Sequence, residues 1–87
     1  MEDSKKRPCF ITLPVVTWSR LNYEEYKHVT PYLFNLDKII CFIPSSHSFR
    51  GEDINITIVW LQDIDRSLEV EMPIAEIKDM IIGKEYV

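Results

Sequence analysis

The sequence predicts a small α+β domain: an antiparallel sheet of four to five strands with one C-terminal helix packed on it. Three observations carry this prediction. Residues 54–61 and residues 68–72 both alternate apolar with polar side chains, which is typical of antiparallel strands. Apolar residues then recur at helical spacing over residues 73–82. The polar run between the two alternating segments indicates a hairpin loop.

Size and composition limit what the chain can do. It has 87 residues, a net charge of −4, 46% hydrophobic and 28% charged residues, as expected for one ordinary domain with a thin core. Two glycines are too few for the glycine-rich loops that bind phosphate. We expect residues 1–8 to be a flexible head and residues 9–87 to be a single α+β domain. No apolar run indicates a membrane span or a secretion signal, so a cytoplasmic location is expected.

The first half of the chain predicts short strands separated by loops. Residues 9–16 are β-branched and aromatic, and Pro14 predicts that this strand lies at a sheet edge or ends at Leu13. Residues 18–31 are polar and predict a loop with one helical turn.

Two more strands and a loop complete this half. Residues 32–36 and 38–43 predict strands joined by a tight turn, because Asn35 and Asp37 favour turns. Residues 44–53 contain Pro, Ser and Gly and predict a loop.

The second half predicts the sheet core. Trp60 continues the row of Ile54, Ile56 and Ile58, so we expect it to be buried, and its truncation to Ala to cost about 3–5 kcal/mol. Glu69 and Glu71 are expected to face solvent. The helix over residues 73–82 is expected to begin with Pro73 and to end at Gly83.

Charge and cysteines argue against two classes of ligand. Residues 1–51 carry seven Lys or Arg against five Asp or Glu, whereas residues 52–87 carry three against nine, which does not fit a nucleic-acid-binding surface. Cys9 and Cys41 are expected to be buried thiols in a reducing compartment. With His28 and His47 they supply zinc-ligand types, but their wide spacing argues against a zinc site. No metal, no cofactor and no catalytic residue is expected.

Two polar segments supply the candidate binding residues. Within residues 44–53, hydroxyls, an imidazole, an aromatic ring and a guanidinium follow one another, a composition suited to recognition. Adjacent Ser and His side chains rarely face each other, so they do not indicate a nucleophile and its base. Within residues 18–26, three aromatic residues and an arginine are either packed on the core or exposed as a contact surface. The candidates are Ser45, Ser46, His47, Ser48, Phe49, Arg50, Arg20, Trp18, Tyr23 and Tyr26.

Several short motifs follow the order of a known family. These are Ile11-Thr12-Leu13, then Asn35-x-Asp37-x-Ile39, then Val70-Glu71 leading into Ile74-Ala75-Glu76-Ile77. In this order the chain resembles the FlbD-like (SwrD) family of small flagellar and swarming proteins, and related short phage or bacterial proteins. The resemblance implies a small sheet with a terminal helix and a role in motility.

The sequence as a whole favours binding over catalysis. We expect a small non-enzymatic protein that acts through contact with a protein partner or through self-association as a homo-oligomer. The alternative is a phage-type anti-defence protein, either an inhibitor of a host protein or an oligomeric sponge for a nucleotide-like signal. In the sponge, Arg20, His47, Arg50 and the aromatic residues would contact the ligand.

Overall fold

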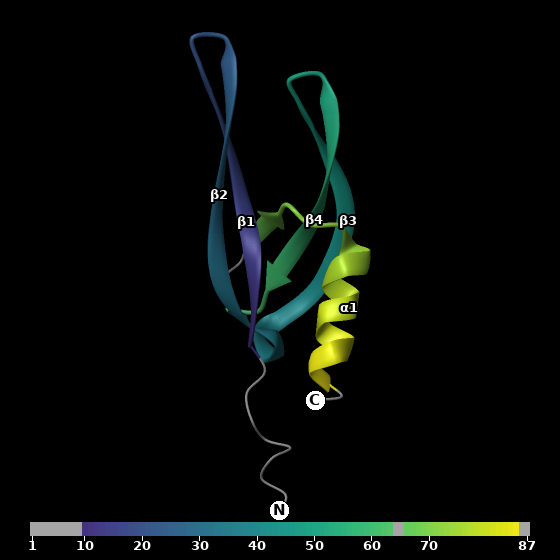
Figure 1. Cartoon of the computed structure of the whole chain (residues 1–87). Coiled ribbons are helices and arrows are strands. Elements are labelled where there is room, and N and C mark those ends of the chain that lie inside the picture. Colours follow the sequence, from purple (N-terminus) through teal and green to yellow (C-terminus); the bar gives the residue numbers. More distant parts are fainter. Residues whose placement is uncertain (1–9, 64–65, 86–87) are drawn as a thin grey trace, which may run out of the picture.

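Two long β-hairpins make up most of the chain (Figure 1). The computed structural model describes residues 10–63 and 66–85. The five strands form one antiparallel sheet in the order β2-β1-β5-β4-β3, followed by one C-terminal helix, so the predicted α+β class is confirmed. The elements are β1 (Phe10–Leu21), β2 (Glu24–Asn35), β3 (Ile39–Phe49), β4 (Glu52–Leu61), β5 (Ser67–Val70) and α1 (Ile74–Glu85).

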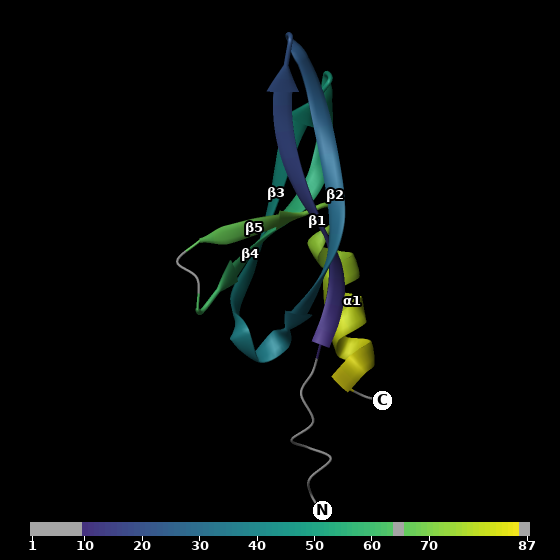
Figure 2. The ribbon, with the colours of Figure 1, turned by 90° about the vertical axis from the view of Figure 1, so that its left-hand side faces the viewer.

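The short strand β5 joins the two hairpins and divides each of them into two parts. It pairs with β1 only at Val15 and with β4 from Thr57 to Trp60. Beyond this level each hairpin continues to its own turn. Figure 2 shows β5 crossing between the hairpins and both of them extending past it. We call residues 16–29 arm 1 and residues 44–56 arm 2.

The prediction of a loop over residues 18–31 and of another over residues 44–53 is wrong. Both segments are paired strands, in register from Leu21 opposite Glu24 to Phe10 opposite Asn35 in the first hairpin. In the second hairpin the ladder begins at Phe49 opposite Glu52. Cross-strand backbone hydrogen bonds hold an arm whatever its side chains are, so a polar composition does not exclude a strand.

Each arm ends in a two-residue turn with both residues in the left-handed region. Asn22 and Tyr23 have φ of 55° and 67°, and Arg50 and Gly51 have φ of 53° and 82°. Positive φ at both central positions defines a type I′ turn, whose twist matches that of the flanking strands. These turns reverse the chain without any loop.

Pro14 neither ends β1 nor places it at an edge, contrary to prediction. β1 lies between β2 and β5. Pro14 lies opposite Pro31 of β2, at a pair whose backbone groups point away from each other, so no hydrogen bond between β1 and β2 is lost there. The Pro14 carbonyl instead accepts a hydrogen bond from the Glu71 N–H at 2.9 Å. A proline is tolerated inside β1 because its nitrogen faces the β5 side, where β5 pairs with β1 only at Val15.

The predicted turn at Asn35–Asp37 is confirmed. A short 3-10 helix, Leu36–Lys38, connects β2 to β3, and the Asn35 side chain accepts a hydrogen bond from the Asp37 N–H at 3.0 Å. Asn is favoured at such a position because its amide oxygen reaches the backbone two residues on.

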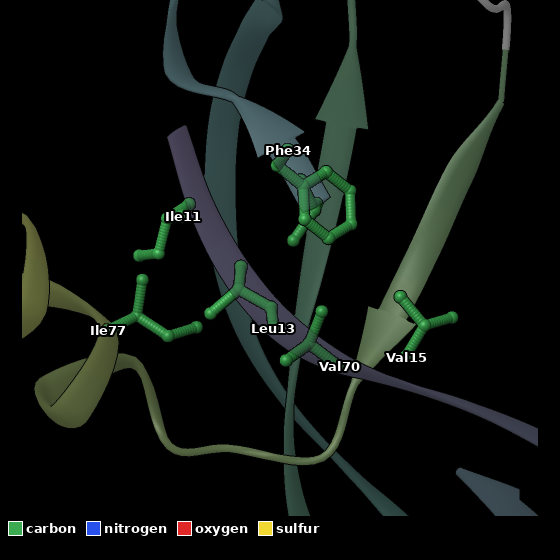
Figure 3. Close-up of a cluster of buried hydrophobic side chains, with 7 residues drawn as sticks. Ile11, Leu13, Val15, Phe34, Val70 and Ile77 are labelled. Atoms are coloured by element: carbon green, nitrogen blue, oxygen red, sulfur yellow. The ribbon is translucent and has the colours of Figure 1, made fainter. Parts of the chain in front are cut away.

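The main core lies between the sheet and α1, on what we call the helix side of the sheet (Figure 3). Side chains alternate along a strand, so the odd residues of β1 and the even residues of β2 share this side. Partly buried residues such as Phe42, Leu68 and Met80 pack against the core. Its fully buried members are Ile11, Leu13, Val15, Phe34, Val59, Val70 and Ile77.

The side of β4 that was predicted to face the core does not face α1. Thr57 and Val59 are the fully buried residues, and the Thr57 hydroxyl donates to the Met72 carbonyl at 2.7 Å. Trp60 points to the other side, the open side, and is 37% exposed. Cys41 is exposed there as well, so neither residue is the core residue that was predicted. Cys9 lies outside the described residues.

Helix α1 begins one residue after Pro73 and continues past Gly83 to Glu85. The Pro73 carbonyl accepts hydrogen bonds from the N–H groups of Glu76 and Ile77, at 3.1 and 3.3 Å. Pro73 therefore precedes the helix, and Gly83 does not end it as predicted. No helix within the described residues is both long and apolar enough to span a membrane.

Candidate functional site

The two arms contact each other on the open side of the sheet. The rings of Trp18 and His47 stack with centroids 3.9 Å apart and planes 9° apart. The Phe49 ring lies 5.5 Å from Trp18 at 48°. Val16 and Ile56 are buried, and the alternation of their strands places them on the same side as Trp18 and His47. The arms therefore share a second, smaller apolar layer, which we call the inter-arm layer.

Two carboxylates attach arm 1 to the centre of the sheet. One is on β5 and the other is on the residue that follows β5. The Trp18 indole N–H donates to the Glu69 carboxylate. The Lys27 ammonium lies 2.7 Å from the Glu71 carboxylate. Both glutamates were predicted to face solvent, and both are half-buried instead because arm 1 folds over the open side of β5.

The tips of the arms are joined at Glu25. The Arg50 N–H donates to the Glu25 carboxylate at 2.7 Å, and the Arg50 guanidinium donates to the Glu25 carbonyl at 3.2 and 2.9 Å. The Arg20 guanidinium binds the other carboxylate oxygen of Glu25 at 3.2 Å. The left-handed backbone of Arg50 directs both its N–H and its side chain at arm 1.

These contacts lower the pKa of the Glu25 carboxyl from its ordinary value of 4.5. The largest cause is the hydrogen bond from the Arg50 N–H, which favours the charged form. Partial burial raises the pKa, and the Arg20 guanidinium and the His47 ring lower it.

Acidification is expected to loosen the contact between the tips. A carboxyl whose pKa is lower in the folded chain stabilises the fold above the unfolded-state pKa, and this contribution is lost as pH falls through the folded-state pKa. The protection of the Arg50 amide, measured by NMR as the intrinsic exchange rate divided by the observed rate, should therefore fall only when the pH drops below about 4.5. The Glu25→Ala variant, which has no side-chain acceptor, should leave the Arg50 amide unprotected at every pH, and the exposed control Glu52→Ala should behave like the wild-type chain. An Arg50 amide whose exchange in the wild-type chain follows only the intrinsic rate across this pH range would contradict the contact.

The structure brings together many of the residues predicted to bind. A shallow hollow of about 230 Å³ between the arms is lined by Trp18, Ser19, Arg20, Glu25, Tyr26, His47 and Phe49. Five of these seven were predicted as binding residues. Sequence reasoning missed Glu25, which was considered only as part of a helical turn, because its partner Arg50 lies 25 residues away in the sequence. Most small-molecule sites measure about 300–1,000 Å³, so this hollow is small for a nucleotide.

A second hollow of about 420 Å³ lies around the tips and places Tyr23 and Arg50 together. It is lined by Arg20, Tyr23, Glu24, Glu25 and Arg50. Here the Arg50 guanidinium is already bound to the Glu25 carbonyl, whereas the Arg20 side chain is 69% exposed.

The three serines are not part of either hollow. Ser46 and Ser48 point to the opposite side of β3 from His47, because successive side chains of a strand alternate. Ser45 shares a side with His47 but is exposed, and the imidazole of His47 is stacked on Trp18.

Tyr23 occupies a position that favours glycine. It is 98% exposed and its φ of 67° is unfavourable for a bulky residue. We expect Tyr23→Gly to raise the free energy of unfolding by about 0.5–1 kcal/mol, as measured by urea denaturation. Tyr23→Ala serves as the control, because it removes the ring but keeps the backbone strain. A loss of stability in Tyr23→Gly would mean that the tyrosine ring stabilises the tip.

The open side also carries an apolar surface below the inter-arm layer. Large side chains from four strands point to it and keep a third or more of their surface exposed, and Leu33 is the most exposed at 69%. We call these residues the open-side surface: Phe10, Val29, Leu33, Ile43 and Trp60.

No family model, no curated protein and no solved structure matches the chain. The resemblance to FlbD-like proteins therefore stays a prediction. Within the described residues, no three His, Cys, Asp or Glu side chains gather as metal ligands.

Proposed function

We propose that this chain is a non-enzymatic binding protein that acts by contact with another protein through its open-side surface. The observation that carries the proposal is the set of five large, partly exposed apolar side chains on the side of the sheet opposite α1. Large apolar side chains exposed on one side of a sheet are typical of surfaces that contact another protein.

The contacts between the arms support binding rather than catalysis. The imidazole of His47 is stacked, and the carboxylates of Glu25, Glu69 and Glu71 each bind a donor from arm 1 or arm 2. A general acid or base needs a position from which it reaches a substrate proton. These four side chains are engaged in holding the arms.

The position of the exposed residues supports a contact surface as well. Leu33 and Val29 lie on β2, and Ile43 and Trp60 lie on β3 and β4, so both hairpins contribute. A partner covering this surface would bury apolar area that the sheet and its single helix leave in water, and each Å² removed from water contributes about 25 cal/mol.

A matched pair of variants tests the proposal. Leu33→Ser removes the most exposed member of the surface, and Leu21→Ser alters a side chain of similar exposure, 62%, at the tip of arm 1. We expect the wild-type chain and Leu21→Ser to retain the same partner from a lysate of the cells that make the protein, and Leu33→Ser to lose it. Equal retention by both variants, or no partner and no self-association, would contradict the proposal.

Native mass spectrometry of the purified protein separates this function from the alternative sponge. The proposed contact function predicts the mass of the polypeptide or of its multiples. An added mass of a few hundred daltons, released on unfolding, would favour a ligand in the hollow between the arms.

A further inference from the structure

We infer that Tyr23, at the turn of arm 1, is a recognition residue that inserts its ring into an apolar pocket of a partner protein, and that the rim of this pocket is basic. The contact is separate from the open-side surface, which lies below the inter-arm layer. The inference therefore goes beyond the proposed function, because it gives the chain a second place at which it contacts a protein.

The Tyr23 ring contributes little to the fold of its own chain. The residue is 98% exposed, so its ring packs on almost nothing. Its φ of 67° lies in the left-handed region, which is unfavourable for a bulky side chain. Tyr23 therefore strains the turn, and no packing of its ring offsets that strain.

The turn of arm 2 provides a comparison within the same molecule. It is also a two-residue turn with both residues at positive φ, and its second position is Gly51, with φ of 82°. A Cβ at Gly51 would meet no atom within 4 Å, so the backbone conformation favours glycine there, not a lack of space. Arm 1 carries a large aromatic residue at the equivalent position. Strained residues of this kind are concentrated where proteins bind ligands or partners.

The shape of the tip indicates a pocket on the partner. The turn of arm 1 is the end of a narrow two-stranded hairpin and lies away from α1 (Figure 1). Tyrosine is enriched among the residues that contribute most to protein–protein affinity, and such residues typically fill pockets. A tyrosine side chain has only two rotatable χ angles, so little conformational freedom is lost when its ring is bound.

The charges at the tips indicate a basic rim around that pocket. Arg20 and Arg50 are both bound to Glu25. The tips carry three further carboxylates, all on exposed residues: Glu24, Glu52 and Asp53. The surface beside Tyr23 is therefore acidic, and a partner of complementary potential carries lysines or arginines around the pocket.

Photo-cross-linking in the cells that make the protein gives the first test. With p-benzoylphenylalanine in place of Tyr23, we expect a cross-link to another polypeptide. The same substitution at Lys78, which is exposed on α1, is the control and should not give that cross-link. Mass spectrometry of the cross-linked peptides should find apolar residues next to Lys or Arg in the partner. No cross-link from position 23, or an equal cross-link from position 78, would overturn the inference.

Titration calorimetry with the purified cross-linked polypeptide tests the role of the ring. Tyr23→Gly and Tyr23→Ala should each lower the affinity at least about tenfold, while Tyr23→Gly raises the stability of the chain. Thr17→Ala, at an exposed position of arm 1 away from the turn, should leave the affinity unchanged. Unchanged affinity in Tyr23→Ala, or a loss of stability in Tyr23→Gly, would overturn the inference.

The salt dependence of the same affinity tests the basic rim. The affinity of the wild-type chain should fall as the NaCl concentration rises from about 0.05 to 0.5 M, because salt screens charges at an exposed rim. The double variant Glu52→Gln, Asp53→Asn should bind more weakly and with a smaller salt dependence. An affinity that does not change with salt would overturn the basic rim.

The two contacts can fail separately. Leu33→Ser should leave the affinity at Tyr23 unchanged, and Tyr23→Gly should leave the partner of the open-side surface bound. A partner that depends on Leu33, with no cross-link from position 23, would overturn this inference and leave the proposed function standing. A partner that depends on Tyr23, with none that depends on Leu33, would contradict the proposed function alone.

Discussion

Truncation of Leu13 to Ala is expected to lower the free energy of unfolding by about 3 kcal/mol. Leu13 is fully buried on the helix side of β1, among the core residues that include Val70 of β5 and Ile77 of α1 (Figure 3). Its removal leaves a cavity where three elements meet, and a thin core has few other contacts to close it.

Urea denaturation followed by circular dichroism measures the effect. Thr12→Ala is the matched control, because Thr12 is the adjacent residue of the same strand and is exposed on the other side. We expect the control to change stability by less than about 1 kcal/mol. Equal losses in the two variants would mean that the core does not lie on the helix side.

Truncation of Trp18 to Ala is expected to lower the free energy of unfolding by about 2–3 kcal/mol. The indole ring stacks on His47, packs near Phe49 and donates to Glu69, so it links arm 1 both to arm 2 and to β5. Loss of the ring should also separate the arms, which would appear as faster amide exchange in residues 44–56.

Two further variants isolate the cause of that loss. Trp18→Phe keeps an aromatic ring but removes the N–H donor to Glu69, and should cost about 1–1.5 kcal/mol. Trp60→Ala removes the other tryptophan, which is part of the open-side surface, and should cost less than Trp18→Ala despite its place in the alternating row of β4. A larger loss of stability in Trp60→Ala than in Trp18→Ala would indicate that Trp60 is buried, as the sequence pattern predicts.

Local sequence patterns predicted the strands and the helix whose side chains pack in the main core. The alternation of residues 54–61 and 68–72 identified the β4–β5 hairpin, and the helical spacing identified α1. The same alternation could not say which side of β4 faces the helix, because both of its sides are partly covered. Thr57 lies on the helix side, where it is buried and donates to the Met72 carbonyl, whereas Trp60 lies on the open side.

The arms could not be predicted from apolar periodicity. Their strands are held by backbone pairing and by a few contacts at their ends, so residues 44–49 have no reason to alternate. The left-handed Asn22 and Tyr23 turn lacks the glycine that usually indicates a type I′ turn. Arg50-Gly51 does contain that glycine, but the surrounding serines led to the prediction of a loop.

The sequence predicted which residues belong to the candidate site but not how they are arranged in space. The sequence singled out Trp18, His47, Phe49 and Arg50 as residues suited to contact, and the structure brings them together from two arms. Pairing across some 30 residues of sequence leaves no local pattern. Much of their surface is consequently buried between the arms, so the proposed partner contact lies on the open-side surface instead.

Methyl NMR spectra of the free chain and of the chain with its captured partner test the proposed contact function most directly. The contact predicts that the methyl signals of Val29, Leu33 and Ile43 on the open-side surface shift or broaden on binding, whereas those of the buried Leu13 and Ile77 stay in place. Changes confined to other parts of the chain, with the signals of Val29, Leu33 and Ile43 unaffected by a bound partner, would contradict the proposal that the open-side surface is the binding site.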